Sequence, residues 1–209
     1  MSFDVPMFPL SMVVYPHQMI ALIVFEPRYR ALLDDIDETQ EFGTCLIARG
    51  SEVGGGDERT NVGTWLRVRG SQRFADGQTF LAVEGVRCIR IDEWAPDDPY
   101  PRARISERCC EDVMIDPDLL ELAETSVRAL RTLQSEVAPD EVAPVRVEMA
   151  KDPWERAWQL CAMTPMATLD QFKVLSLENP NERLALLNEI CCERYGDYQR
   201  LLAMGPPGV

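Results

Sequence analysis

The spacing of apolar residues changes along this chain and divides it into two parts. Up to about residue 105 the apolar residues form short runs or alternate with polar ones, which is the period of β-strands. From residue 116 onward they recur every three or four positions, which is the period of amphipathic helices. The pattern predicts an α+β fold, with a β-rich subdomain over residues 1–110 and an α-helical subdomain over residues 111–209.

The first part contains strand-like segments separated by turn residues. Residues 19–25 form a nearly continuous apolar run, which is typical of a strand buried on both faces. Further strands are predicted over residues 43–48, 62–69, 79–84, 86–93 and 103–108. A glycine-rich loop is expected over residues 51–61, and Asp76-Gly77 suits a hairpin turn. Many short strands of this kind indicate a small barrel or a strongly curled sheet.

An abrupt change of period occurs at Phe25, Glu26, Pro27, Arg28 and Tyr29. Proline has a fixed φ and no backbone N–H, so Pro27 suits the first position of a helix. We expect the Glu26 carboxylate to accept from free N–H groups at the helix start, and Tyr29 to lie on the apolar stripe of the helix. These five residues are interpreted as a structural motif, in which a buried strand passes directly into a short helix.

Four helices are predicted in the second part, over residues 117–137, 153–163, 169–177 and 180–204. Asp116, Asp152 and Asn179 each precede a proline, so each places an Asx N-cap before a proline at the first helical position. For the helix predicted over residues 169–177, Thr168 is the expected N-cap, with Gln171 three residues later. A loop is predicted over residues 138–149, which contain two prolines.

Composition narrows the possible partners. The net charge is −14, which argues against a surface that neutralises many phosphates, so no nucleic acid is expected. No apolar run approaches the ~18 residues that span a bilayer, and the first residues lack a basic segment. We therefore expect no membrane association, no secretory signal and a cytoplasmic location. The seven cysteines include no Cys-x-x-Cys pair, so they are interpreted as reduced packing residues.

The sequence carries no recognisable catalytic or metal-binding constellation. There is no G-x-x-x-x-G-K-[ST] motif for phosphate binding. The only histidine, His17, follows Pro16 and is predicted to be an exposed turn residue. Lys151 and Lys173 are the only lysines, and neither lies in a Ser-Lys arrangement. We expect no catalytic residue, no metal and no cofactor.

Three blocks of sequence, in order, resemble the N-terminal substrate-binding domain of the ATP-dependent Lon proteases. They comprise Pro9-Leu10, Tyr15-Pro16, residues 22–26 and Arg28-Tyr29; then residues 42–47, 62–64 and 80–88; then residues 161–166, 169–175 and 181–184. Gly63 and Gly85 match glycines of the family, where a bulge or tight bend is the expected reason. Two positions depart: His17 stands where glycine is usual, and Ala21 where proline is usual.

The resemblance implies a β-domain with a PUA-like barrel, then a helical bundle, in a stand-alone member without the ATPase and peptidase domains. It implies a non-enzymatic module that captures unfolded or exposed polypeptide, with polypeptide clients or a protease or chaperone complex as partners. The oligomeric state stays open. So do two alternative functions: an RNA-binding PUA-like protein, and a small-molecule binder or hydrolase in a groove between the two halves.

The candidate peptide-binding residues are Trp65, Arg67, Phe74 and Trp94. Large aromatic side chains and arginines are frequent at the centre of binding surfaces. Trp65 is expected to be exposed, because it lies on the arginine-flanked face of its predicted strand, opposite the face of Val62 and the other apolar residues. For the aromatic candidates in general, burial in the core is favoured over a role in binding.

Overall fold

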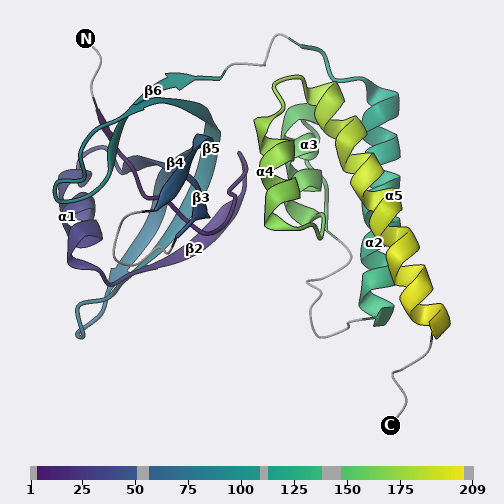
Figure 1. Ribbon diagram of the computed structural model, residues 1–209, viewed down its shortest axis with the longest axis horizontal. Helices are drawn as coiled ribbons and strands as arrows, with labels where there is room; N and C mark the ends of the chain where they lie inside the picture. Colours follow the sequence, from purple (N-terminus) through teal and green to yellow (C-terminus); the bar gives the residue numbers. More distant parts are fainter. Residues whose placement is uncertain (1–3, 51–56, 109–112, 138–146, 205–209) are drawn as a thin grey trace. The chain divides into compact units, whose positions relative to one another are not determined.

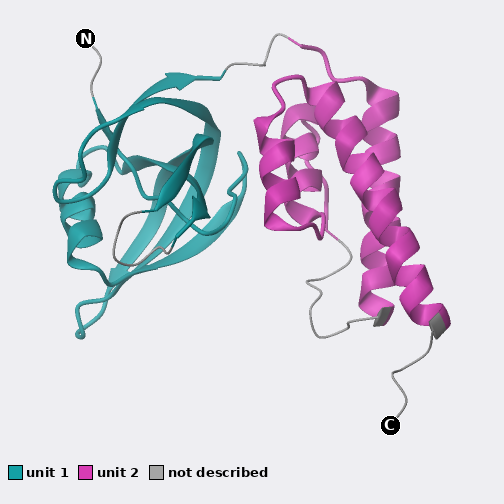
Figure 2. Ribbon diagram, viewed as in Figure 1, with its two compact units in different colours: residues 1–109 teal, residues 110–209 magenta. Residues whose placement is uncertain are grey.

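The computed structural model describes residues 4–50, 57–108, 113–137 and 147–204. Contacts divide the chain into two compact units, Met1–Cys109 and Cys110–Val209 (Figure 2). The first unit contains strands β1 (Val5–Pro6), β2 (Met19–Val24), β3 (Glu41–Arg49), β4 (Glu58–Arg73), β5 (Thr79–Trp94) and β6 (Arg102–Glu107), with helix α1 (Pro27–Asp35). The second contains α2 (Pro117–Val137), α3 (Pro153–Met163), α4 (Thr168–Ser176) and α5 (Pro180–Met204).

The strands of the first unit form one sheet that curls back on itself (Figure 1). The strand order is β1-β6-β5-β4-β3, and β2 pairs with β5 outside this path. The N-terminal segment joins the two ends of this order: β1 pairs with β6, while Met7 bridges Gly43 and Leu10 bridges Leu46 on β3. The prediction of an α+β fold with a curled sheet is confirmed.

Gly63 and Gly85 allow two segments to pass very close to the sheet. A Cβ on Gly63 would lie 1.9 Å from the carbonyl oxygen of Thr44, and a Cβ on Gly85 would lie 2.1 Å from that of Tyr15. The register of the sheet also shifts beside both glycines. The predicted irregularity is therefore present, and its cause is close backbone contact.

Three strand predictions need correction. β4 begins at Glu58, within the segment predicted as a loop, and residues 51–56 of that loop lie outside the described residues. The two strands predicted on either side of Gly85 are one strand, β5, because a register shift absorbs the irregularity. β2 is not buried on both faces: Met19, Ala21 and Ile23 are exposed, while the residues between them point inward.

Helix α1 starts at Pro27 as predicted, but the role of Glu26 differs. The carbonyl of Glu26, and not its carboxylate, accepts the N–H of Tyr29, and Glu26 makes no side-chain cap. Its carboxylate instead accepts from Arg28, at 3.1 Å. Tyr29 is buried and stacks against Phe8 with 3.9 Å between the ring centroids, so it ties α1 to the core of the sheet.

Three helices of the second unit start at the predicted prolines. The side chains of Asp116, Asp152 and Asn179 each accept a backbone N–H from the first turn, which confirms the Asx caps. α4 differs, because its N-cap is Ala167 without a side-chain bond, so the start predicted at Thr168 and Gln171 is wrong. Most of the loop predicted over residues 138–149 lies outside the described residues.

None of the helices that the structure describes combines the length and the apolar character that crossing a bilayer requires.

Candidate functional site

Large apolar side chains are exposed on one face of the first unit, where β2, β5 and β4 run next to one another. The exposed fraction is 54% for Met19, 59% for Ile23, 49% for Phe25, 47% for Phe74 and 37% for Phe80. We call these five residues the outer apolar face. Exposed apolar side chains that gather on one face are typical of an interaction site, because folding alone does not require them.

The register of the sheet brings the outer apolar face together. Ile23 is opposite Phe80 across β2 and β5, and Phe80 is opposite Gln72 across β5 and β4. The N–H of Phe74 donates to the carbonyl of Gln78, so the ladder of the hairpin continues beyond the last residue of β4. Phe74 follows Gln72 by two positions and therefore lies on the same face as Phe80.

Of the four predicted peptide-binding residues, Phe74 alone lies on the outer apolar face. Trp65 is only 8% exposed, so its expected exposure is wrong. Its indole N–H donates to Glu41 at 2.9 Å, and its ring packs in a small core that includes Met7 from the N-terminal segment. The reason is long-range: the closing of the sheet covers the face of β4 that carries Trp65.

Arg67 and Trp94 are also engaged within the protein. Arg67 donates to the second oxygen of Glu41, at 2.7 Å. Burial raises the pKa of Glu41, but the hydrogen bonds from Trp65 and Arg67 lower it by more, so the pKa lies below its ordinary value. Trp94 is half-buried beneath the guanidinium of Arg59, which lies 4.7 Å from its ring centroid. The structure therefore does not gather the four candidates into one site.

The arginines along β4 are neutralised by acidic side chains of the same unit. Arg67 pairs with Glu41, Arg69 with Glu84, and Arg73 with Asp34. A phosphate backbone would have to displace these carboxylates before it could bind the arginines. The geometry of β4 therefore does not favour the RNA-binding alternative.

The sequence interpretation missed most of the outer apolar face. The sequence pattern places Phe25 in the structural motif and Met19 and Ile23 in a strand buried on both faces, and it places Phe80 in a strand with no exposed face assigned. The sequence does contain one signal for them. In residues 19–25 the side chains of both strand faces are apolar. A small sheet that few helices cover can bury only one of these faces, so the other face is expected to be exposed.

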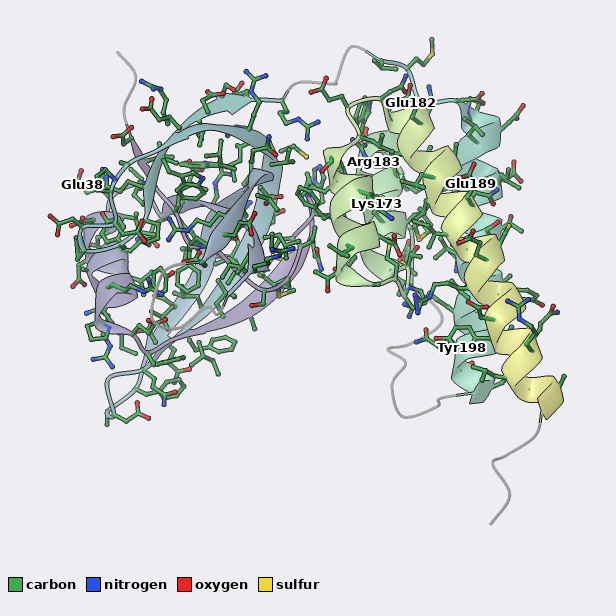
Figure 3. All side chains as sticks on the ribbon, viewed as in Figure 1. Glu38, Lys173, Glu182, Arg183, Glu189 and Tyr198 are labelled. Carbon is green, nitrogen blue, oxygen red and sulfur yellow. The ribbon has the colours of Figure 1, made fainter. Side chains whose placement is uncertain are left out.

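A buried arginine stabilises the helices of the second unit and is not a binding group. Arg183, labelled in Figure 3, is 1% exposed at the start of α5. Its guanidinium donates to the carbonyls of Leu177 at 2.6 Å and Val174 at 3.3 Å, and it lies 3.7 Å from the ring centroid of Trp158. It thus satisfies carbonyls at the C-terminal end of α4, where a helix leaves them without partners.

Four of the five described thiols are buried and behave as packing residues. Cys45, Cys88, Cys161 and Cys191 are buried, and Cys192 is exposed. Burial raises the pKa of Cys45 to about 12 and that of Cys191 to about 11, so both stay protonated near neutral pH. Within the described parts of the chain, no group of His, Cys, Asp and Glu side chains could hold a metal ion.

The sequence as a whole matches a family model. The family is described as the ATP-dependent protease La (LON) substrate-binding domain, and the match covers residues 4–193. The chain belongs to this family. The resemblance drawn from the three sequence blocks is therefore confirmed.

Individual relatives agree with this assignment. A LON peptidase N-terminal domain and RING finger protein of Schizosaccharomyces pombe is 23% identical over 214 residues, which cover 87% of this chain and 43% of that protein. The Lon protease of Dictyoglomus thermophilum is 31% identical over 102 residues, which cover 48% of this chain and 13% of that protein. The chain thus spans less than half the length of these relatives.

Solved structures share the fold of this Lon-family chain. A Lon N-terminal domain protein from Xanthomonas campestris superposes with a TM-score of 0.62 at 25% identity, covering 88% of this chain and 96% of that one. The N-terminal domain of a Mycobacterium avium complex Lon protease superposes with a TM-score of 0.64 at 18% identity, covering 93% and 99%.

Proposed function

We propose that this chain is a non-enzymatic recognition module that binds apolar segments of unfolded or partly unfolded polypeptides on the outer apolar face. The observation that carries the proposal is the group of five exposed apolar side chains on one face of β2, β5 and β4. The description of the family as substrate-binding domains supports it. The partners are polypeptide clients, presented directly or through a protease or chaperone complex.

The area of the outer apolar face sets the strength of binding. Covering one half-exposed aliphatic or aromatic side chain contributes about 1 kcal/mol at ~25 cal/mol per Å². Five such side chains contribute about 5 kcal/mol before the entropic cost of association is subtracted. These contacts alone should therefore hold a single segment with a Kd of about 0.2 mM or weaker. Binding in this range lets the module release one segment and contact another.

A labelled polypeptide tests the proposal. The probe is a fluorescein-labelled protein that reduction and alkylation keep unfolded, and the measurement is its fluorescence anisotropy during titration with the chain. Ile23→Ser removes an exposed apolar group, so it should raise the Kd about three- to tenfold while the fold is retained. Leu169→Ser is the matched control, because Leu169 is 68% exposed on α4 of the other unit.

Two outcomes would contradict the proposal. Equal Kd values for the unaltered chain, Ile23→Ser and Leu169→Ser would show that the outer apolar face does not bind the probe. Appearance of probe fragments on prolonged incubation with the purified chain, detected by mass spectrometry, would show that the module is an enzyme.

A further inference from the structure

Strand β2 has hydrogen-bonding groups that no other strand of the described residues satisfies. Its partner is β5. The N–H of Gly85 donates to the carbonyl of Gln18, directly before β2, which sets the phase of this antiparallel ladder. Because residues alternate between facing the partner strand and facing away, Met19, Ala21 and Ile23 direct their N–H and C=O groups away from β5.

The pairing of β5 with β4 shows independently which residues of β5 bond to β2. The N–H of Phe74 donates to the carbonyl of Gln78, so residues 78, 80 and 82 of this strand bond to β4. Residues 79, 81 and 83 remain for β2, and their register partners are residues 24, 22 and 20. In the described part of the chain, no backbone hydrogen bond outside the β2–β5 ladder involves residues 19–24.

A shallow apolar groove follows this open edge. It has a volume of about 130 Å³, and residues 21–25 line it one after another. Successive residues of a strand point to opposite faces, so five consecutive residues line one groove only when the groove runs along the edge of the strand. Phe8, Leu10 and Tyr29 line the groove as well, and Glu26 is its one charged lining residue. Phe8 and Leu10 direct their N–H groups to β3, so the groove separates β2 from the N-terminal segment.

We infer that an extended polypeptide segment adds to β2 as a further strand, bonded to Met19, Ala21 and Ile23. The occupant is a polypeptide because only its backbone offers donors and acceptors that repeat at every second residue along an edge. One alternating set of its side chains would enter the apolar groove, and the other would extend the outer apolar face.

This inference rests on the proposed function and specifies the substrate class. The edge binds segments that are apolar at consecutive positions, as buried strands of other proteins are, because both alternating sets contact apolar surface. Amphipathic helices do not present a free backbone and would not fit. A second copy of this chain, paired through its own β2, is the competing occupant.

Backbone methylation separates strand addition from side-chain contact. The probe is a fluorescein-labelled eight-residue peptide of valine, leucine and threonine in three forms: unmodified, with three N-methyl groups on alternate residues, and with three N-methyl groups spread over both edges. The second form keeps one complete bonding edge, so it should bind within about threefold of the unmodified peptide. The third form loses N–H groups on both edges and should bind at least about tenfold more weakly.

The outcomes distinguish this inference from the proposed function. Equal affinities of the two methylated forms would overturn strand addition, and the outer apolar face would still bind the peptide. Failure of the unmodified peptide to bind would contradict both, provided the unfolded polypeptide probe also fails. Ile23→Ser changes a side chain of the outer apolar face and leaves the N–H and C=O groups of residue 23 in place, so its comparison with Leu169→Ser tests the proposed function separately.

A substitution in β2 provides a second test. Ala21→Pro removes an N–H that faces away from β5, so no native ladder bond is lost, and proline is tolerated on the free side of an edge strand. It should weaken peptide binding at least about tenfold with an unchanged Tm, whereas Ala21→Val, which keeps the N–H, should retain binding. Unchanged binding by Ala21→Pro would overturn the inference. A dimer of the chain in sedimentation would also overturn it, if Ala21→Pro dissociates the dimer but added peptide does not. That result would mean that a second copy occupies the edge of β2.

Discussion

Replacing Arg183 by methionine tests how the helices of the second unit are held together. Methionine fills the space of the aliphatic stem but removes the guanidinium. Two hydrogen bonds from a charged donor contribute about 1.5–3 kcal/mol each, and the buried contact with Trp158 contributes about 2 kcal/mol. The gross loss is about 5–8 kcal/mol, from which the cost of burying the charge, several kcal/mol, must be subtracted. We expect the free energy of unfolding to fall by about 2–4 kcal/mol.

Urea unfolding followed by circular dichroism at 222 nm measures this loss, because the signal comes mainly from helices. Arg200→Met is the control: Arg200 lies on the same helix with its side chain 73% exposed, and its ion pair with Asp197 should contribute less than about 1 kcal/mol. Arg183→Lys should lose most of the stabilisation, since an ammonium group cannot donate as a planar fork.

If Arg183→Met lowers the free energy of unfolding by less than about 1 kcal/mol relative to Arg200→Met, Arg183 does not stabilise the helices in this way. That result would mean that the carbonyls at the end of α4 find other donors at little cost, or that the desolvation of the guanidinium cancels its hydrogen bonds.

Two further predictions concern the first unit. His17 is exposed and has a φ of 60°, which is strained for a residue with a Cβ. His17→Gly should therefore stabilise the protein by about 0.5–1 kcal/mol in thermal unfolding, whereas His17→Ala, which keeps the Cβ, should not. Equal effects of the two substitutions would rule out backbone strain as the cause. The pKa of Glu41 is lowered in the folded state, so the stability that Glu41 adds is complete above its ordinary value of 4.5 and is lost as the pH falls through the folded pKa. Glu41→Gln should therefore be less stable than the unaltered chain at pH 7 in urea unfolding, and the difference should shrink as the pH falls below 4.5; a difference that stays constant over this range would contradict this assignment.

Local chemistry explains what could be predicted from the sequence. An Asx residue before proline caps a helix through bonds to the next two or three residues, so the starts of α2, α3 and α5 agree with the structure. Pro27 likewise begins α1 where the period changes. α4 shows the limit of this approach, because Ala167 caps it without any side-chain bond that a pattern could reveal.

The candidate site could be predicted only in part. The alternation along β4 separated Trp65 from Leu66 correctly, but both faces are buried there, because the N-terminal segment crosses one of them. Phe74, a candidate whose burial the sequence leaves open, lies on the outer apolar face. Its neighbours in space, Ile23 and Phe80, were not candidates, since the β2–β5 register that joins them links residues 57 positions apart.

The sequence by itself determined the type of most elements and the family. A period of two or 3.6 residues depends on contacts within a few positions, and the family blocks depend on residue identity alone. Only the tertiary structure decided which face of each strand meets water. The period shows which residues share a face, whereas the curl of the sheet and the path of the N-terminal segment decide which face is covered. The open edge of β2 and the outer apolar face follow from that long-range arrangement.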